Sequence, residues 1–401
     1  GTGTAPLLEL DPAGNLHVLY KDEIDLMYAN NIGGSWSTPV VARVDIDGET
    51  QNADNAVVVV GGGYDTVHDT TAHPAAADGA GNAVFMLDLV SGAELWRAGP
   101  DGGADLTNAD MTRSIPTTIK VVDLTGNGYA DRMYASDMGG QVWRFDIHNG
   151  EDVADIVTGG VIARLGAEGT NDTSAAATRR FYNSPDVSIF VDPMQNRRFV
   201  AVNVGSGYRA HPFDLSATDR FFSLRDPDVF TKLPQSAYTT YSVITDDDLV
   251  EISGQAGAIV GQSDRGWKLT VPDGQKILAD SVTFNDEVFF VAFTPDSTSA
   301  DVCSAGRGTN FLYRVSAVNG DPVVPNLDTL NPDFSDAARR TTLRQGGIAP
   351  SPTILFPSPD DPDCQGEACD PPPIFCVGVE CADPGFDNNP VRTLWTQDGI
   401  E

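Results

Sequence analysis

The chain has 401 residues, of which 41% are hydrophobic and 20% are charged, and it contains 40 Gly and 26 Pro. Its 57 acidic residues outnumber its 25 Lys and Arg residues, which gives a formal net charge of −32 at pH 7. Such a charge disfavours binding to nucleic acid or to an anionic membrane surface, and no apolar run reaches the roughly 18 residues of a membrane span. The opening GTGTAPLLEL lacks an initial Met and a signal segment, which is typical of a mature or excised fragment.

Short apolar or alternating runs, separated by turn residues, follow one another along most of the chain. In chain order, strands are expected within residues 39–44, 56–65, 83–89, 117–124, 141–147, 197–209, 220–226, 258–262, 266–271, 287–294 and 311–318. Helical periodicity is confined to a few places, among them residues 171–181 and 332–343. Parallel βαβ units are therefore not expected, and the chain is predicted to be all-β.

Two weak internal repeats indicate how these strands are grouped. Residues 81–96, 139–151 and 309–322 each carry an apolar strand followed by a Gly turn, and VVVVGGGYD is similar to VAVNVGSGYR. Repeats at intervals of several tens of residues predict the blades of a β-propeller, with a pair of β-sandwiches as the alternative. Tyr64 and Tyr208, in the Gly-rich turns of the second repeat, are expected to pack between blades rather than to contact a ligand.

The segment DLTGNGYAD, residues 123–131, has oxygen-bearing side chains at alternating positions of a Gly-containing turn. A calcium loop needs about six to eight oxygens around one centre, and its ligands recur at alternate positions with a Gly that permits the sharp turn. The segment lies between two predicted strands, so it is expected to be a calcium loop between strands. The predicted ligands are the side chains of Asp123, Thr125, Asn127 and Asp131 and the backbone carbonyl of Tyr129.

Two features of this loop depart from the usual pattern. Thr125 stands where Asp is usual, which removes one negative charge, and Tyr134 replaces the bidentate Glu of an EF-hand. The alternative is an Asn-Gly hairpin whose Asp residues cap the turn. Calcium is favoured because a plain turn does not need four spaced oxygen donors.

Four of the five cysteines, Cys364, Cys369, Cys376 and Cys381, lie close together, whereas Cys303 stands alone. They form two copies of Cys-x-Gly-x-x-Cys around a Pro-rich spacer, which in an acidic, Gly- and Pro-rich chain indicates disulfides. The repeated Gly favours closure of each copy on itself, with Cys303 free or variable. A four-thiolate zinc site is the alternative.

The sequence contains no convincing catalytic constellation. It has no Gly-x-Ser-x-Gly elbow, and no His is tied by sequence to a nucleophile. His68 and His73 share a loop with two Asp residues, but their spacing fits no tight metal template. The Gly-rich turns at 61–65 and 205–209 follow strands, yet no helix follows them as a dinucleotide site requires. The chain is therefore predicted not to be an enzyme.

Beyond residue 351 the composition changes to Pro, Asp and Cys. The predicted organisation is a propeller domain over residues 1–356, with the calcium loop at 123–131. A Pro- and Cys-rich excursion over residues 357–401 is expected to pack on this propeller.

A set of motifs spread over nearly the whole chain carries a family resemblance. The motifs are WSTPVVARV, GGGYD, DLTGNGYADRMYASDMGGQVWRFDI, VGSGYRAHPFD and the closing PTILFP, CDPPPIFCVGVEC and RTLWTQ. Together they resemble the C-terminal domain of PilY-type type IV pilus tip adhesins. The calcium-loop segment joined to GGQVWRFD is the most specific part of the resemblance.

The resemblance implies a modified, quinoprotein-dehydrogenase-like β-propeller with seven irregular blades, which binds Ca²⁺ through the five residues named above. It implies a pilus tip and assembly module that supports pilus biogenesis, regulates extension against retraction in twitching motility, and contributes to surface adhesion. The expected partners are minor pilins, the N-terminal region of the same protein, and host or abiotic surfaces. The expected location is the cell surface at the pilus tip, or the periplasm during assembly.

The alternative function is that of a quinone-cofactor-dependent dehydrogenase of the propeller class. MLDLVSGAELW, residues 86–96, resembles the Trp-docking motif of those enzymes, which also use calcium. They bind calcium together with the cofactor in a central channel, whereas the ligands predicted here lie in one continuous loop. The adjacent-cysteine disulfide frequent in those enzymes is also missing from this sequence. Because a shared fold does not transfer chemistry, the non-enzymatic function is preferred.

Overall fold

The structure, a computed structural model, is almost entirely β, as the sequence predicts. It describes residues 34, 37–49, 55–70, 76–170, 172–192, 197–254, 258–261, 263–272, 274–296, 307–323, 338–356 and 373–382, and the backbone of two strands near the start of the chain. Helices are limited within these residues to α2 (Val67–Thr70), α3 (Gln235–Tyr238) and the 3-10 turns η1 (Ala175–Ala177) and η2 (Asp246–Asp248). No helix in this part of the chain has the length and apolarity needed to cross a bilayer.

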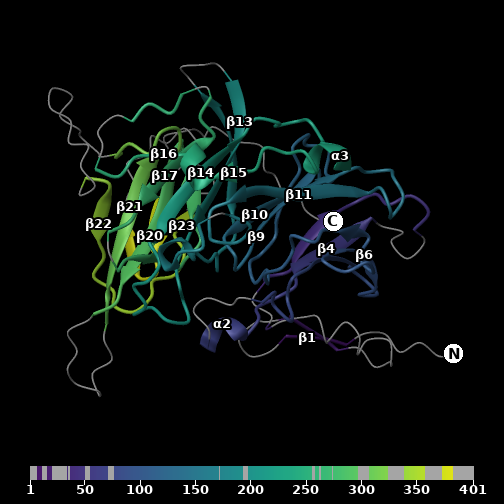
Figure 1. Ribbon diagram of the computed structural model, residues 1–401, viewed down its shortest axis with the longest axis horizontal. Coiled ribbons are helices and arrows are strands. Elements are labelled where there is room, and N and C mark those ends of the chain that lie inside the picture. Colours follow the sequence, from purple (N-terminus) through teal and green to yellow (C-terminus); the bar gives the residue numbers. More distant parts are fainter. Residues whose placement is uncertain are drawn as a thin grey trace, which may run out of the picture.

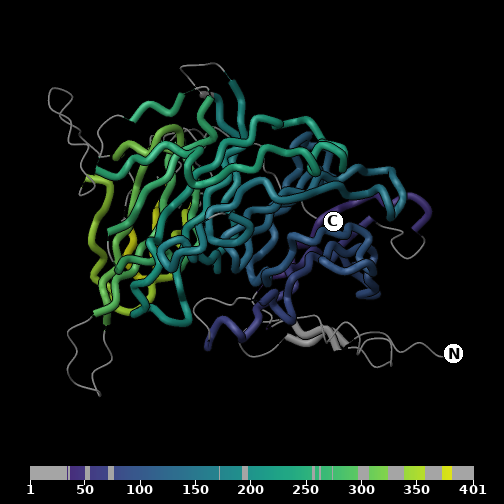
Figure 2. The backbone as a smooth tube through the Cα atoms, in the orientation of Figure 1, coloured from purple at the N-terminus to yellow at the C-terminus, as the bar shows by residue number. Residues whose placement is uncertain are grey.

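The strands form a series of sheets that follow one another along the chain (Figures 1 and 2). The first sheet contains β3 (Val40–Arg43), β4 (Ala56–Gly61), β5 (Val84–Asp88), β6 (Glu94–Gly99) and β7 (Leu106–Thr107). The second contains β8 (Lys120–Val122), β9 (Arg132–Ser136), β10 (Gln141–Ile147), β11 (Val157–Arg164) and β15 (Ile244–Thr245). The third contains β12 (Asp186–Asp192), β13 (Arg197–Gly205), β14 (Arg220–Asp226), β17 (Gly266–Thr270) and β16 (Val250–Glu251).

The remaining sheets come from the second half of the chain and from its start. The fourth sheet contains β18 (Lys276–Ile277), β19 (Val282–Phe284), β20 (Glu287–Thr294), β21 (Thr309–Ser316) and β22 (Arg340–Thr342). The fifth contains β23 (Thr353–Leu355), β24 (Ile374–Val377) and β25 (Glu380–Ala382). A separate hairpin contains β1 (Leu7–Leu10) and β2 (Leu16–Leu19). The part of the chain that the structure describes thus forms five sheets of three or more strands, against the seven blades predicted.

The internal repeats occupy equivalent places in these sheets, so they correspond to real structural units. The repeats at 81–96, 139–151 and 309–322 contain β5, β10 and β21, and each of these strands is third in the pairing order of its sheet. The repeats at 57–65 and 200–209 contain β4 and β13, which are both second strands. Repeated up-and-down sheets of this kind are the units of a propeller.

The five sheets meet at one cavity of about 450 Å³. Its lining includes Thr38, Thr118, Ser184, Asp280 and Ser351. Each of these residues lies two positions before a strand of a different sheet, and we call these strands, β3, β8, β12, β19 and β23, the inner strands. We call the five residues the axial residues. Because one comes from every sheet, the sheets converge on a common axis, which is the arrangement of propeller blades.

Hydrogen bonds join the axial residues in chain order. The Thr38 amide donates to Thr118 Oγ1 over 3.0 Å, and Ser184 Oγ donates to the Thr118 carbonyl over 2.7 Å. The Ser184 amide donates to Asp280 Oδ1 over 2.8 Å, and the Asp280 amide donates to Ser351 Oγ over 3.0 Å. Each sheet is therefore tied to the next at its inner edge.

Apolar clusters fill the space between successive sheets. Trp96 of the first sheet packs edge-on against Phe145 of the second, with ring centroids 6.3 Å apart. Between the third and fourth sheets, Phe290 stacks against Phe221 and Tyr313, with centroids 4.0 and 4.6 Å apart. The adjacent Phe289 points the other way, into a cluster with the fifth sheet. Central strands are thus buried on both faces, which explains continuous apolar runs such as EVFFVAFT.

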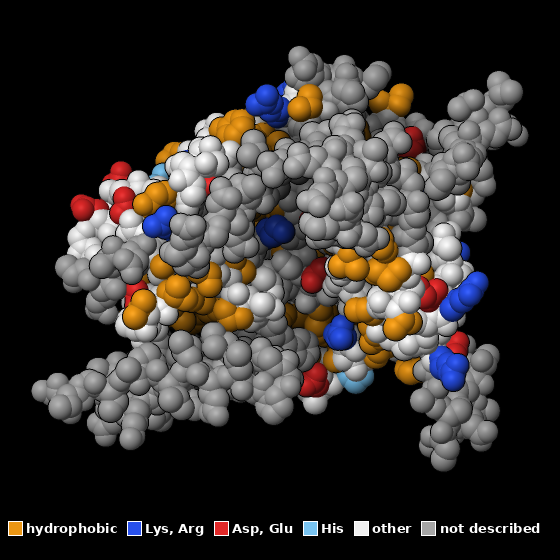
Figure 3. All heavy atoms as spheres, turned by 180° about the vertical axis from the view of Figure 1, so that it is seen from behind, with side chains coloured by type: hydrophobic (Ala, Val, Ile, Leu, Met, Phe, Trp, Pro, Cys, Tyr) orange, Lys and Arg blue, Asp and Glu red, His pale blue; other side chains and the backbone are white. Residues whose placement is uncertain are grey.

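Among the described residues, exposed apolar side chains such as Phe213, Phe230 and Ile259 come from separate loops. On the face drawn in Figure 3, the Lys and Arg side chains of the described residues are separated from one another. This part of the surface therefore presents no continuous basic patch.

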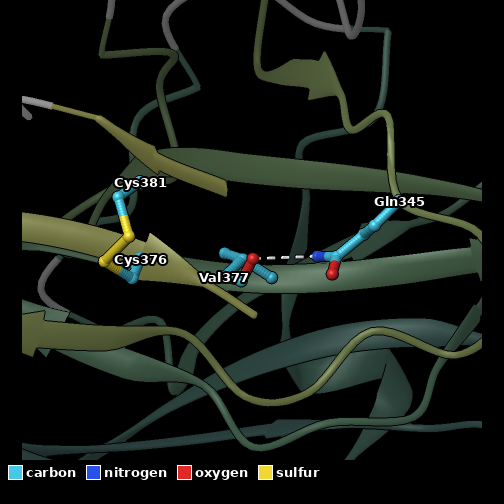
Figure 4. The surroundings of a disulfide bond; sticks show 4 residues. All are labelled: Gln345, Cys376, Val377 and Cys381. Carbon is cyan, nitrogen blue, oxygen red and sulfur yellow. Dashed lines mark hydrogen bonds between the residues drawn. A yellow bond between two sulfur atoms is a disulfide. The ribbon is translucent and has the colours of Figure 1, made fainter. Parts of the chain in front are cut away.

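Residues 373–382 of the Cys-rich segment contribute β24 and β25 to the fifth sheet. Cys376 and Cys381 form a disulfide across the β24–β25 pair, as the sequence predicts (Figure 4). Gln345 Nε2 donates to the Val377 carbonyl over 2.9 Å, and Phe375 lies 4.4 Å from Phe289 between ring centroids. The other three cysteines lie outside the described residues, so the rest of the disulfide pattern stays a prediction, as does the boundary at residue 356.

Two expectations of helix are wrong where the structure describes the chain. Residues 172–181 contain only the turn η1, because Arg179 donates to the carbonyls of Leu165 and Thr218 and Phe181 is buried between sheets. These tertiary contacts outweigh local helix propensity. Residue 171 lies outside the described residues. In the second segment, residues 340–342 form strand β22 against β21, and residues 332–337 lie outside the described residues.

The expectation that the two tyrosines of the Gly-rich turns pack between blades is confirmed. Tyr64 and Tyr208 are buried and pack in one small cluster with Met138 and Tyr182. The Tyr208 hydroxyl donates to the His68 carbonyl over 2.6 Å. Their role is therefore to join segments that are far apart in the sequence.

We expect Phe290→Ala to lower the free energy of unfolding by about 3–5 kcal/mol, because it removes the central ring of the stack between the third and fourth sheets. Chemical denaturation measures this loss. Phe213→Ala is the matched control: this ring is 65% exposed, so its removal should change stability by less than about 0.5 kcal/mol. Equal losses for the two variants would contradict this account of the packing.

Candidate calcium-binding loop

The predicted calcium loop connects two neighbouring strands of the second sheet. Residues 123–131 follow β8 and precede β9, and the Asp131 amide donates to the Val122 carbonyl over 2.9 Å where the two strands meet. Gly126 and Gly128 have φ angles of +71° and +85°, which side chains with a Cβ rarely adopt. The loop therefore lies between strands as predicted, and its glycines are required by backbone conformation.

Asp123 organises the first half of the loop. Its Oδ1 accepts hydrogen bonds from the amides of Thr125, Gly126 and Asn127 over 3.2, 2.7 and 3.3 Å. Its Oδ2 accepts from the Gly128 amide over 2.7 Å. One carboxylate thus satisfies four consecutive backbone donors and holds the turn closed.

Asp131 closes the second half and is almost completely buried. Its Oδ2 accepts from the amides of Leu124 and Thr125, both over 3.0 Å, and from Thr125 Oγ1 over 2.9 Å. Its Oδ1 lies 2.8 Å from Lys232 Nζ. Burial alone would raise the pKa of Asp131, but the ion pair with Lys232 and the bonds from Thr125 hold this pKa below its usual value. The carboxylate is therefore ionised at neutral pH.

Thr125 brings the two carboxylates together. Its Oγ1 is 3.4 Å from Asp123 Oδ1 and 2.9 Å from Asp131 Oδ2, so three predicted ligand residues place oxygens around one point. Asn127 Oδ1 accepts from the Tyr129 amide over 2.9 Å instead. An all-oxygen donor set with two carboxylates suits a hard cation such as calcium better than a transition metal.

Among the described residues, no three His, Cys, Asp or Glu side chains gather in a way that could hold a metal ion. The loop contributes only two such side chains, because its remaining donors are hydroxyl, amide and carbonyl oxygens. His68 is buried against Asp78, with Nε2 2.8 Å from Oδ2, and His73 lies outside the described residues.

The end of the loop is attached to the first sheet. The Ala130 amide donates to the Arg43 carbonyl over 2.8 Å, and the Arg43 guanidinium lies 5.7 Å from the centre of the Tyr129 ring. Asn149 Nδ2 donates to the Ala130 carbonyl over 2.9 Å. The loop therefore contacts the first sheet on one side and, through Lys232, a segment that follows β14 of the third sheet on the other.

Comparison with known proteins gives one consistent relative. No family model matches the chain. The Type IV pilus biogenesis factor PilY1 of Pseudomonas aeruginosa, from strains PAO1 and PAK, is 29% identical over 151 residues, which are 38% of this chain and 11% of the relative. The crystal structure of the P. aeruginosa PilY1 C-terminal domain aligns over 92% of this chain and 76% of that chain, with a TM-score of 0.56 and 18% identity.

The chain is similar in sequence to part of PilY1 and has the fold of the PilY1 C-terminal domain. The predicted resemblance and the modified propeller fold are thereby confirmed. The chain spans only 11% of the length of the curated relatives. A quinohemoprotein alcohol dehydrogenase from Comamonas testosteroni aligns over 71% of this chain and 49% of that chain, with 11% identity and a TM-score of 0.29, which is too low to support an argument.

The chain also contains a buried ionic cluster behind the loop that was not predicted. Arg132 Nε lies 2.6 Å from Asp146 Oδ1, and Arg144 lies 2.9 Å from Asp146 and 3.0 Å from Asp226. The Tyr134 hydroxyl donates to Asp226 Oδ2 over 2.8 Å. The signal in the sequence was the presence of charged residues inside apolar strands, where burial requires a partner.

We expect Asp123→Ala to loosen the loop even when calcium is removed by a chelator, because four backbone amides lose their acceptor. Hydrogen exchange at Gly126 and Gly128 should become at least about tenfold faster, since a hydrogen bond to a charged group contributes about 1.5–3 kcal/mol. Mass spectrometry of exchange measures this, and the amides of β10 serve as the internal control. Unchanged exchange at both glycines would contradict the role given to Asp123.

Proposed function

We propose that this chain is a calcium-binding module of the type IV pilus tip and assembly machinery. The observation that carries the proposal is the sequence and fold similarity to PilY1, a protein named for type IV pilus biogenesis. The loop adds the calcium part, because it combines two carboxylates with hydroxyl, amide and carbonyl oxygens. Asp123, Thr125, Asn127, the Tyr129 carbonyl and Asp131 would hold the ion.

Calcium would act on the module by stabilising one loop geometry. An ion that binds one state better than another shifts the equilibrium by its difference in affinity. The loop contacts Arg43 of the first sheet and Lys232 of the segment after β14. A more rigid loop would therefore fix the positions of several sheets relative to one another. This supports a role in regulating the balance between pilus extension and pilus retraction, and hence in twitching motility.

The proposed partners are minor pilins and the N-terminal region of the same protein, with host or abiotic surfaces as adhesive targets. The proposed location is the cell surface at the pilus tip, or the periplasm during assembly. The Cys376–Cys381 disulfide supports such a location, because disulfides persist in oxidising compartments.

We expect Asp123→Ala and Asp131→Ala each to weaken calcium binding at least about tenfold, or about 1.4 kcal/mol, because each removes a full charge from the site. Thr125→Asp should tighten binding, since it adds a ligand charge. Calorimetric titration of the purified chain measures all three. In cells, the two Ala variants should be exported but should alter surface piliation or twitching.

Asp172→Ala is the matched control for these variants, because Asp172 caps an exposed turn away from the loop through the Ser174 amide. It should bind calcium as the parent chain does. All variants should keep the propeller fold, while the Ala variants of the loop lose the rise in thermal midpoint that calcium produces. Parental calcium affinity in both loop variants would show that residues 123–131 form only a turn.

We further propose that the chain is not a quinoprotein dehydrogenase, since the loop's donors are contiguous and need no cofactor. Dye reduction with alcohols or sugars should stay at background when quinone cofactor and calcium are supplied. Turnover that depends on the cofactor would instead support the dehydrogenase alternative.

A further inference from the structure

Lys232 places a positive charge directly on a predicted calcium ligand. Its ammonium lies 2.8 Å from Asp131 Oδ1, and its side chain is 29% exposed whereas that of Asp131 is 3% exposed. The two residues are distant in the sequence. Asp131 ends the loop between β8 and β9 of the second sheet, whereas Lys232 lies in the segment after β14 of the third sheet. The loop oxygen that faces Lys232 is therefore already paired with a cation that belongs to the protein.

The backbone on both sides of Lys232 is fixed by the buried ionic cluster. The Thr231 carbonyl accepts hydrogen bonds from Arg132 Nη2 over 2.8 Å and from Arg144 Nη2 over 2.7 Å. The Leu233 amide donates to Asp146 Oδ2 over 2.9 Å. Because both neighbours are held, the base of the Lys232 side chain stays beside Asp131, and Arg132 directly follows that carboxylate in the chain.

We propose that Lys232 is an internal cation of the loop, which occupies Asp131 in the metal-free protein and lowers the affinity of the loop for calcium. This inference rests on the proposed calcium function. The ammonium competes for Asp131 Oδ1, and its charge repels a divalent ion bound a few ångströms away. Since the Lys232 side chain is partly exposed, the ammonium can withdraw by a change of rotamer while the backbone of residues 231–233 stays fixed.

A purely structural role for Lys232 makes a different prediction. If the lysine only held the loop closed, its removal would loosen the metal-free loop and would weaken calcium binding or leave it unchanged. As a competing cation, its removal frees Asp131 and removes the repulsion, so calcium binding becomes tighter. The direction of the change in affinity therefore separates the two roles.

The test is calorimetric titration of Ca²⁺ into the parent chain and the variant Lys232→Met. We expect the variant to bind calcium at least about tenfold more tightly, and Lys232→Arg, which keeps the charge, to bind within about threefold of the parent. Lys268→Met is the matched control. It removes the same charge and an ion pair of the same length, 2.8 Å to Asp246, away from the loop, so its calcium affinity should stay parental.

Thermal unfolding supplies a second readout. In chelator, Lys232→Met should unfold at a lower temperature than the parent, because the buried carboxylate of Asp131 has lost its partner. Calcium should then raise the midpoint of the variant by more than it raises the midpoint of the parent.

The outcomes separate this inference from the proposed calcium function. If Lys232→Met binds calcium as well as the parent does, or more weakly, the inference is overturned and the calcium function stays in place. Binding by the variant but not by the parent supports the inference and removes calcium from the function of the natural chain. Absence of binding by both at millimolar calcium overturns both.

Discussion

Hydrogen bonds between the axial residues are the constraint from which the rest of the fold follows. One axial residue for each of the five sheets lies at the cavity, and four hydrogen bonds of 2.7–3.0 Å join these residues in chain order. Thr, Ser and Asp have short polar side chains that can bond to a neighbouring backbone at this cavity. Each bond contributes about 1 kcal/mol, but together they fix where every inner strand begins. The apolar clusters between sheets can then form in sequence.

The position of the calcium loop is a direct consequence of this arrangement. Thr118 is an axial residue, β8 follows it as a strand of three residues, and the loop begins at Asp123. One end of β8 is thus held at the axis and the other at the loop. Contacts from Ala130 to Arg43 and from Asp131 to Lys232 attach the loop to the elements on either side. A cation in the loop would therefore act at a junction of sheets rather than on an isolated turn.

Much of the fold and of the candidate loop could be predicted from local patterns, because strand alternation, the Gly turns and the spacing of loop oxygens are encoded in neighbouring residues. The Cys376–Cys381 closure followed from spacing in the same way. The axial residues escaped prediction because Thr, Ser and Asp before a strand look like ordinary turn residues. The visible clue was a Thr-Pro or Ser-Pro pair ahead of three inner strands, at residues 38–39, 184–185 and 351–352.

Contacts between distant segments account for what the sequence could not reveal. Nothing near Lys232 in the chain indicates that it meets Asp131, because that contact depends on how the second and third sheets pack. The same is true of the buried cluster, in which Arg144 pairs with Asp226 from the third sheet. The helix expected over residues 171–181 did not form for a related reason: Arg179 bonds to the carbonyls of Leu165 and Thr218, and Phe181 packs against Phe222 of the third sheet. Local propensity is a weak determinant where tertiary contacts compete.

The charges around the loop bear on how tightly it would hold an ion. Two carboxylates, a Thr in place of a usual Asp, and a nearby ammonium give the loop fewer net negative charges than high-affinity calcium loops carry. Ligand charge count tunes affinity in such loops, and extracellular modules work at about 10⁻⁴–10⁻³ M. A site that is far tighter than the surrounding calcium concentration stays filled and transmits no information, because its occupancy does not change. For the proposed role in pilus extension and retraction, a weak loop whose occupancy follows its surroundings is the one that can regulate.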